Sequence, residues 1–261
     1  MTVNNYLVNL ASDLVLSSAE RTGIATSIST LSLRLDSYFG NGIENHFQFG
    51  SNSRGTILPR QADSNSDVDY MVVFDTSDGQ KKPQTYLDRL KKFAEKKYST
   101  SEISQSSPTI VLSLNHIRFE LVPAINNYGY QIPSPTSSWS EWMSTDPSLA
   151  NKTVVDKNNA ENYQIKPLVR LIKYWNAKQG HPFASFDLEQ YIVNQYYWSC
   201  TSLKDYFYEF WEGFSCTHDT AQYIKDKVER AKKHAATAKQ YEVDNMPVSA
   251  ELEIQKIVPE L

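Results

Sequence analysis

Apolar residues recur at helical spacing through the first part of the chain. Ile24, Ile28 and Leu31 are examples, and few glycines or prolines interrupt residues 6–39. An apolar residue every three to four positions forms one face of an amphipathic helix. The pattern therefore predicts one or two helices over residues 6–39, which Gly40-Asn41-Gly42 ends.

The spacing changes from helical to alternating after this glycine-rich stop. Residues 46–49 alternate as in a strand that leads into Gly50-Ser51, and residues 53–56 suit a short helical turn. Residues 59–66 predict a loop. Residues 67–74 are rich in β-branched and aromatic residues and predict a strand.

Two further features complete the first half of the chain. Residues 83–98 return to helical spacing with Pro83 in the first turn, where the missing N–H of proline breaks no helical hydrogen bond. Residues 109–112 and 117–122 are apolar runs joined by a short polar connection. This arrangement predicts a β-hairpin.

Pro, Ser, Asn and Gly are dense in residues 126–140, and the chain turns helical beyond them. Helical patterns cover residues 166–179, 185–198, 203–214 and 220–241, followed by a short amphipathic stretch at 251–258. Ser185 is placed to cap the second of these helices. The sequence thus predicts an α+β protein in which residues 1–140 form the first domain and residues 141–261 a helical lobe.

The overall charge excludes a protein that binds polyanions through its whole surface. The 261 residues include 26 Lys and Arg against 30 Asp and Glu, a net charge of −4. Basic runs in residues 89–97 and 225–239 are interpreted as solvated helix faces, with RNA contact as the alternative, so there is no strong nucleic-acid signal. Neither a signal peptide nor an apolar span of membrane length is recognised, and we expect a cytoplasmic protein without membrane association.

Cysteine, histidine and aromatic residues suggest no further chemistry. Cys200 and Cys216 lack the spacing of metal ligands and are expected to be buried free thiols, with a disulfide as the alternative. The five histidines are scattered, which argues against a zinc site. Aromatic residues gather in residues 196–211 and are expected to form mostly core of the helical lobe, with a partner surface as the alternative.

Two carboxylates flank one residue at the start of the strand predicted for residues 67–74. Residues i and i+2 of a strand point to the same face, so Asp67 and Asp69 lie side by side and need a cation between them. Divalent ions such as Mg²⁺ take carboxylate oxygens together with substrate phosphates. The Gly50-Ser51 turn offers N–H groups and a hydroxyl to anionic oxygens. This combination predicts a nucleoside triphosphate site, whereas the acid pair alone is more often a solvated turn or helix cap.

Glu120 is a charged residue inside an apolar predicted strand. One interpretation is a solvent-facing acid that shares its face with Arg118 and Val122. The other is a third ligand, since three carboxylates on adjacent strands can hold two Mg²⁺ ions that activate a hydroxyl and carry the triphosphate. Glu120 would then lie near the attacking oxygen and is also a candidate general base.

The same residues resemble a known family. Gln48-Phe49-Gly50-Ser51, Arg54-Gly55-Thr56, Ser66-Asp67-Val68-Asp69 and Phe119-Glu120-Leu121-Val122-Pro123 are similar to motifs of the bacterial CD-NTases. These are relatives of cyclic GMP-AMP synthase and the oligoadenylate synthetases within the DNA polymerase beta-type nucleotidyltransferases. The resemblance extends over roughly residues 24–198. It implies a polymerase beta-like core of a small mixed sheet with helices, a C-terminal helical lobe, and an active site in the cleft between them.

The resemblance also implies roles for individual residues. It assigns Asp67, Asp69 and Glu120 as catalytic metal ligands for two Mg²⁺ or Mn²⁺ ions. It assigns nucleotide binding to Gly50, Ser51, Arg54, Lys173, Ser185 and Phe186. Lys173 would contact phosphate, with a solvated helix face as the alternative. Phe186 would stack on the donor base, with core packing as the alternative.

The function implied is the joining of nucleoside triphosphates into a cyclic or linear oligonucleotide second messenger, with release of pyrophosphate. Anti-phage signalling and an activating or effector protein partner are implied with it. Two other functions stay open: nucleotide transfer to a macromolecule such as a tRNA end or a protein side chain, and a catalytically dead nucleotide sensor. The loop between Ser51 and Asp67 is longer than the spacing usual in the family, which indicates either a shifted phosphate turn or a cap on the site.

Overall fold

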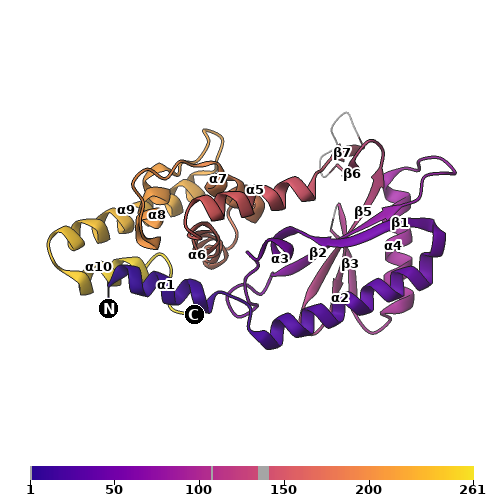
Figure 1. The fold of residues 1–261 in the computed structure, drawn as a ribbon, viewed down its shortest axis with the longest axis horizontal. Coiled ribbons are helices and arrows are strands. Elements are labelled where there is room, and N and C mark those ends of the chain that lie inside the picture. The colour runs from indigo at the N-terminus through magenta and orange to yellow at the C-terminus, as the bar shows by residue number, and fades with distance from the viewer. Residues whose placement is uncertain (1, 107, 135–140) are drawn as a thin grey trace. The chain divides into compact units, whose positions relative to one another are not determined.

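A computed structural model describes residues 2–106, 108–134 and 141–261 and divides the chain into two compact units (Figure 1). The sheet unit consists of Ser17–Ile57 and Asn65–Lys152. The helical unit consists of the chain up to Leu16, Leu58–Ser64 and Thr153–Leu261. Both units are therefore built from separate stretches of sequence.

The sheet unit is organised around one mixed sheet. Its strands run in the order β1 (Ile43–Phe49), β2 (Asp67–Phe74), β5 (Arg118–Asn126), β4 (Thr109–Ser113) and β3 (Glu102–Ser106). β2 and β5 pair in parallel, whereas β1–β2, β4–β5 and β3–β4 pair antiparallel. The end of β5 also pairs with β6 (Tyr130–Pro133), and β6 pairs with β7 (Trp142–Ser144). The parallel pair places the starts of β2 and β5 at the same edge of the sheet.

Alternation along β2 separates its polar start from its apolar faces. Val68 is fully buried, whereas Asp67 and Asp69 on either side of it are half-buried. Met71 and Val73 continue the face of the two aspartates and form a buried cluster with Ala124 of β5. The acids therefore lie at the open end of a face that is apolar further along.

Helices α2 (Ser18–Phe39) and α4 (Pro83–Lys97) pack against the sheet and against each other. Phe39 of α2 meets Phe74 of β2 edge to face, with ring centroids 5.4 Å apart, and Tyr38 meets Phe93 of α4 at 5.3 Å. A 3₁₀ turn, η1 (Gly40–Gly42), ends α2. The short helix α3 (Gly50–Arg54) follows β1 directly.

The helical unit has a core of large aromatic and aliphatic side chains. Its helices are α1 (Val3–Asp13), the second part of α5 (Pro147–Ala160), α6 (Ile165–Lys178), α7 (Ser185–Asn194), α8 (Leu203–Gly213), α9 (Gln222–Val243) and α10 (Pro247–Gln255). Trp175 of α6 and Trp211 of α8 meet edge to face with centroids 4.9 Å apart, and both are fully buried. Leu58 and Ala62 join this core, so the long loop before β2 contributes apolar side chains to the helical unit.

Most elements predicted from the sequence are confirmed. Residues 6–39 fall in two helices, α1 and α2, and the strand predicted for residues 67–74 is β2. The hairpin predicted for residues 109–122 is the β4–β5 pair. Cys200 and Cys216 are free thiols, although they are half-buried rather than buried.

Other details differ from the prediction. Ser185 is not an N-cap: Ala184 holds that position, and Ser185 is the first residue of α7. The helix predicted for residues 185–198 stops at Asn194 because Gln195 takes an extended conformation. Tyr196 and Trp198 beyond it stack on each other in solvent, whereas Tyr197 between them and the later aromatic residues of the cluster are core.

The compact units divide the chain at other points than the predicted boundary at residues 140 and 141. The sheet unit continues to Lys152, which lies within α5. α1 belongs to the helical unit because Tyr6, Leu7 and Leu10 pack into its core. Residues 135–140, at the end of the predicted linker, lie outside the described residues. Across the described parts of the chain, no helix is long and apolar enough to span a membrane.

Candidate active site

Asp67, Asp69 and Glu120 lie on one face of the sheet. β2 and β5 pair in parallel with Asp67 opposite Arg118 and Asp69 opposite Glu120. Directly paired residues of neighbouring strands share a face, and so do residues two apart on one strand. The register therefore brings together the three acids that the sequence singled out.

Gly50 leaves the space that the Asp69 carboxylate occupies. It begins α3 in a left-handed conformation, with φ of 71°, which glycine adopts without strain. A methyl group at this position would overlap the Asp69 carboxylate. Ser51 follows at the start of the turn, and its carbonyl oxygen accepts hydrogen bonds from the N–H groups of Thr56 and Ile57 at 2.9 and 3.1 Å. The phosphate turn and the acid pair predicted from the sequence are therefore in direct contact.

Glu120 lies in a setting that favours its protonated form. Its side chain is 25% exposed and shares its face with Arg118, so it is partly screened from solvent. Burial, followed by the negative charge of Asp67, raises the pKa of Glu120 to about 7, against the opposing effect of Arg118. Near neutral pH this carboxyl group can both accept and release a proton.

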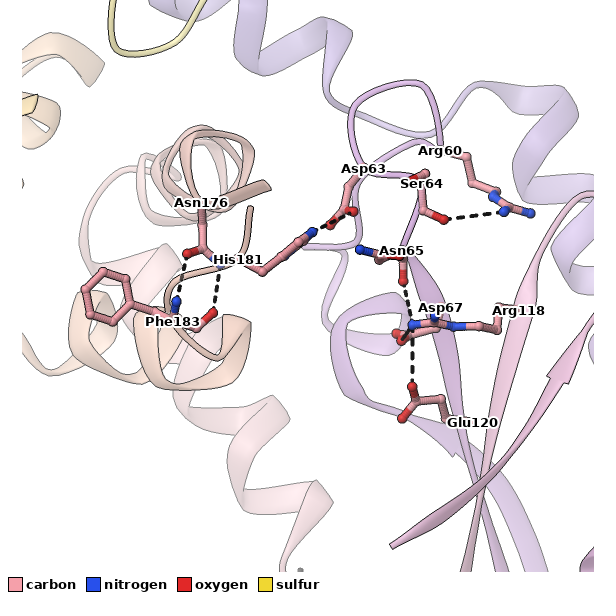
Figure 2. A network of polar contacts seen from close by, with 10 residues as sticks. All are labelled: Arg60, Asp63, Ser64, Asn65, Asp67, Arg118, Glu120, Asn176, His181 and Phe183. Atoms are coloured by element: carbon pink, nitrogen blue, oxygen red, sulfur yellow. Dashed lines mark hydrogen bonds and ion pairs between the residues drawn. The ribbon is translucent and has the colours of Figure 1, made fainter. Parts of the chain in front are cut away.

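Arg118 contacts Asp67 and Glu120 (Figure 2). Its Nη2 donates to Asp67 Oδ2 at 2.8 Å and to the backbone oxygen of Asn65 at 2.9 Å, and it lies 3.5 Å from Glu120 Oε1. A guanidinium between carboxylates offsets part of their mutual repulsion.

The acids share a face without forming a closed cage. Among the residues that the structure describes, no three His, Cys, Asp or Glu side chains form a ready-made metal-binding group. The donor chemistry nevertheless fits Mg²⁺ or Mn²⁺, which take one or two carboxylates and complete their shell with water and substrate phosphates. Gly50 supports this fit because its missing side chain keeps the Asp69 carboxylate free of steric overlap.

Arg54 and Lys173 are both buried. Arg54 ends α3 and is 6% exposed, and Lys173 lies on α6 at 7% exposed. This low exposure does not fit the solvated helix face considered for Lys173. Charged side chains that are this buried in native proteins are paired with an opposite charge or hydrogen-bonded. The phosphate contacts expected for both residues stay predictions.

Ser185 and Phe186 open α7 of the helical unit. Phe186 is 49% exposed, so its side chain is not packed in the core. The loop before α7 is fixed by Asn176, a fully buried residue of α6 whose amide bonds the N–H and the carbonyl oxygen of Phe183 at 3.1 and 2.8 Å. Nε2 of His181 in the same loop lies 3.2 Å from Asp63 Oδ1. Figure 2 marks this contact. The base-stacking role of Phe186 and the phosphate role of Ser185 stay predictions.

Comparison with known proteins identifies the family. Residues 1–158 match the model of the Second Messenger Oligonucleotide or Dinucleotide Synthetase domain, known as SMODS. The chain belongs to this family, the CD-NTases. The resemblance inferred from the sequence motifs is thereby confirmed.

Two curated relatives match parts of this CD-NTase. It is 31% identical over 115 residues to a probable cyclic nucleotide synthase of Bacillus cereus (strain VD146), covering 39% of this chain and 34% of that protein. It is 25% identical over 186 residues to a cyclic AMP-AMP-AMP synthase of Acinetobacter sp. (strain ATCC 27244 / 9458), covering 68% of this chain and 53% of that protein. The matches thus span about half or less of the curated relatives.

Solved CD-NTase structures share the fold. Escherichia coli MS115-1 CdnC, in a complex with HORMA-deltaN, superposes with a TM-score of 0.73 at 17% identity over 98% of this chain and 96% of that chain. Vibrio cholerae DncV, a cyclic AMP-GMP synthase bound to the linear intermediate pppA(3′,5′)pG, gives 0.70 at 12% identity over 91% of each chain. The predicted α+β class with a polymerase beta-like core is confirmed.

Two polar residues of this CD-NTase were missed as functional candidates. Arg118 stands two residues before Glu120, and this spacing alone places the two side chains on the same face. The contact of Arg118 with Asp67 could not be predicted in this way, because it depends on the pairing of β2 with β5. Asn176 follows Tyr174 and Trp175 in a buried stretch of α6. An amide among buried aromatic residues is a signal that a backbone segment needs hydrogen bonds.

Proposed function

We propose that this protein is a metal-dependent nucleotidyltransferase that joins nucleoside triphosphates into a cyclic or linear oligonucleotide and releases pyrophosphate. The observation that carries the proposal is the register of β2 and β5, in which Asp69 stands opposite Glu120 with Asp67 on the same face. Membership of the SMODS family supports a second-messenger product. Nucleotide complexes among the relatives with the same fold, such as E. coli CdnC with ATP, support the substrate class.

The proposed mechanism assigns a task to each group in the sheet unit. Gly50 and Ser51 hold the donor triphosphate next to Asp69. Asp67, Asp69 and Glu120 would hold Mg²⁺ or Mn²⁺, which would supply charge stabilisation for the triphosphate and the leaving pyrophosphate. Glu120, which stands opposite Asp69 on the neighbouring strand, would also accept the proton of the attacking hydroxyl.

The proposal also includes three residues of the helical unit and Arg54 of the sheet unit. Lys173 would act as a point charge towards phosphate, Ser185 as a hydrogen-bond donor, and Phe186 as a stacking surface. Arg54 would support the phosphate turn from the end of α3. The exposure of Phe186 at 49% favours stacking over core packing.

The product assay separates this function from its rivals. The purified protein is incubated with labelled NTPs and Mg²⁺ or Mn²⁺, and the products are treated with phosphatase and resolved by chromatography. A phosphatase-resistant species that the Asp67→Asn plus Asp69→Asn variant does not make is the expected result. Labelling of added tRNA or protein without a small product would instead indicate a macromolecular acceptor.

A role in cytoplasmic anti-phage signalling is part of the proposal, supported by membership of a second-messenger family. The E. coli CdnC complex with HORMA-deltaN supports a search for a protein partner. Cells carrying the wild-type protein in its native gene context should survive phage challenge better than cells carrying the double Asp→Asn variant. Equal survival would argue against the defence role.

A further inference from the structure

Arg118 lies within the cluster of carboxylates. One nitrogen, Nη2, is 2.8 Å from Asp67 Oδ2, 3.5 Å from Glu120 Oε1 and 2.9 Å from the backbone oxygen of Asn65 (Figure 2). The three side chains are 25–30% exposed, so water screens these contacts only in part. The guanidinium is therefore a bound cation within the candidate metal site.

The strand register fixes this position. Arg118 lies directly opposite Asp67 across the parallel pair and two residues before Glu120 on β5, which puts all three on one face. A long side chain reaches both neighbours from that point. The contact thus follows from the same geometry that aligns the acids.

Arg118 and a divalent metal need the same oxygens. A metal bound by Asp67 and Glu120 takes lone pairs of Oδ2 and Oε1, towards which Arg118 Nη2 is directed. Two cations that use the same lone pairs also repel each other.

We propose that Arg118 is an internal counter-cation that stabilises the metal-free site and competes with the divalent metal for Asp67 and Glu120. The inference rests on the proposed function, which makes these acids the metal ligands. When the metal binds, the guanidinium loses its contacts with the two carboxylates and keeps its hydrogen bond to the Asn65 carbonyl oxygen. This oxygen is not one of the proposed metal ligands. Metal binding is weakened until a triphosphate adds its own oxygens, so the two ligands bind together.

Mn²⁺ binding to the nucleotide-free protein tests this competition without any activity measurement. Free Mn²⁺ is counted by electron paramagnetic resonance in titrations of the wild type, Arg118→Gln and Arg118→Lys. Removing the cation in Arg118→Gln should tighten Mn²⁺ binding about tenfold, the factor that corresponds to one hydrogen bond to a charged group. Arg118→Lys keeps the charge and should bind within about threefold of the wild type. Arg60→Gln, which removes an exposed arginine bound to the Ser64 carbonyl oxygen, is the matched control and should change nothing.

The melting temperature gives a second readout. Without metal, Arg118→Gln should melt at a lower temperature than the wild type, because no cation then offsets the repulsion among the three carboxylates. Addition of Mn²⁺ should raise the melting temperature of this variant more than that of the wild type. Equal or weaker Mn²⁺ binding by Arg118→Gln would overturn the inference and make Arg118 an orienting residue. If that variant fails to fold, Arg118→Met, which also removes the cation, is judged by the same criterion.

The metal assignment itself is checked in the same titrations. Asp67→Asn plus Asp69→Asn should abolish Mn²⁺ binding. If this variant binds Mn²⁺ as the wild type does, the metal lies elsewhere, and the proposed function loses its site together with the inference. If it loses binding while Arg118→Gln does not tighten it, only the role of Arg118 is wrong.

Discussion

Gly50 decides how closely the start of α3 and the strand β2 approach each other. Its backbone is in the left-handed region, and the space above its α-carbon holds the Asp69 carboxylate. Two requirements therefore coincide at one residue: a conformation that other residues rarely adopt and room for the Asp69 carboxylate. No other amino acid meets both without displacement of Asp69.

Gly50→Ala should abolish most activity while the protein stays folded. The added methyl group pushes the Asp69 carboxylate away, and a misplacement of about 1 Å costs about 100-fold in rate. The measurement is product formation from labelled NTPs, with circular dichroism to check folding.

Gly79→Ala is the matched control. Gly79 also has a positive φ, of 92°, but a methyl group there would meet no atom within 4 Å. This variant should lose about 1 kcal/mol of stability from backbone strain and keep its activity. If the two variants lost activity equally, strain rather than overlap with Asp69 would be the cause.

Single elements follow local sequence where burial and periodicity agree. β2 was predictable residue for residue because β-branched and aromatic side chains fill residues 67–74 and both of its neighbours are strands. β3 was not, because Ile103 is the one apolar residue in it, and its strand conformation comes from pairing with β4. α5 was missed for a similar reason, since Val154 is its buried apolar side chain.

The candidate site was predictable in its residues but not in its contacts. The Asp-Val-Asp spacing places two carboxylates on one face whatever the rest of the chain does. That Asp69 faces Glu120, and that Arg118 meets Asp67, depends on pairing between strands distant in sequence. The end of α7 at Asn194 could not be predicted either. Tyr196 and Trp198 are of residue types that usually belong to a core, but both are exposed here.

The N-terminus of α8 gives a test of an element and its pH dependence. One oxygen of Asp205, Oδ2, accepts hydrogen bonds from the backbone N–H and hydroxyl groups of both Thr201 and Ser202, at 2.8–3.1 Å. Burial acts to raise the pKa of Asp205, but these hydrogen bonds outweigh it and lower the pKa below its ordinary value. The ionised carboxylate therefore stabilises the folded state.

Asp205→Asn should lower the free energy of unfolding by about 1 kcal/mol at pH 7. A carboxyl group with a lowered folded pKa contributes stability above its unfolded pKa and loses that contribution as the pH falls through the folded pKa. The gap between wild type and variant should therefore close below about pH 4. Urea unfolding at several pH values measures the difference in the free energy of unfolding between the wild type and the variant. A difference that stays constant down to pH 3 would contradict this account.

At the scale of the whole molecule, the chain passes between the two units several times. The helical unit takes residues from the N-terminal stretch, from Leu58–Ser64 and from the part after Lys152. Leu7 and Leu58 are fully buried in its core, together with Leu168 of α6. A loop of extra length before β2 was visible in the sequence, but its packing in the helical unit was not, because a short polar-rich segment carries no periodic signal.

A fragment of residues 141–261 should therefore not fold cooperatively. It lacks Leu7, Leu10 and Leu58, whose burial contributes about 6 kcal/mol, a large part of the stability of an ordinary domain. Circular dichroism melting of the fragment beside the full chain measures this. A sharp transition near the melting temperature of the full chain would show that the predicted division at residue 140 yields an independent domain.

The most direct test of the central claim is metal-dependent pyrophosphate release from NTPs by matched aspartate variants. Asp67→Asn and Asp69→Asn change the acids at the start of β2, whereas Asp75→Asn changes the exposed aspartate just beyond its end, which bonds Ser77. We predict that the wild type and Asp75→Asn release pyrophosphate with Mg²⁺ or Mn²⁺, and that Asp67→Asn and Asp69→Asn lose at least about 100-fold of this rate. Release by Asp67→Asn and Asp69→Asn at the wild-type rate would contradict the assignment of these acids as the catalytic centre.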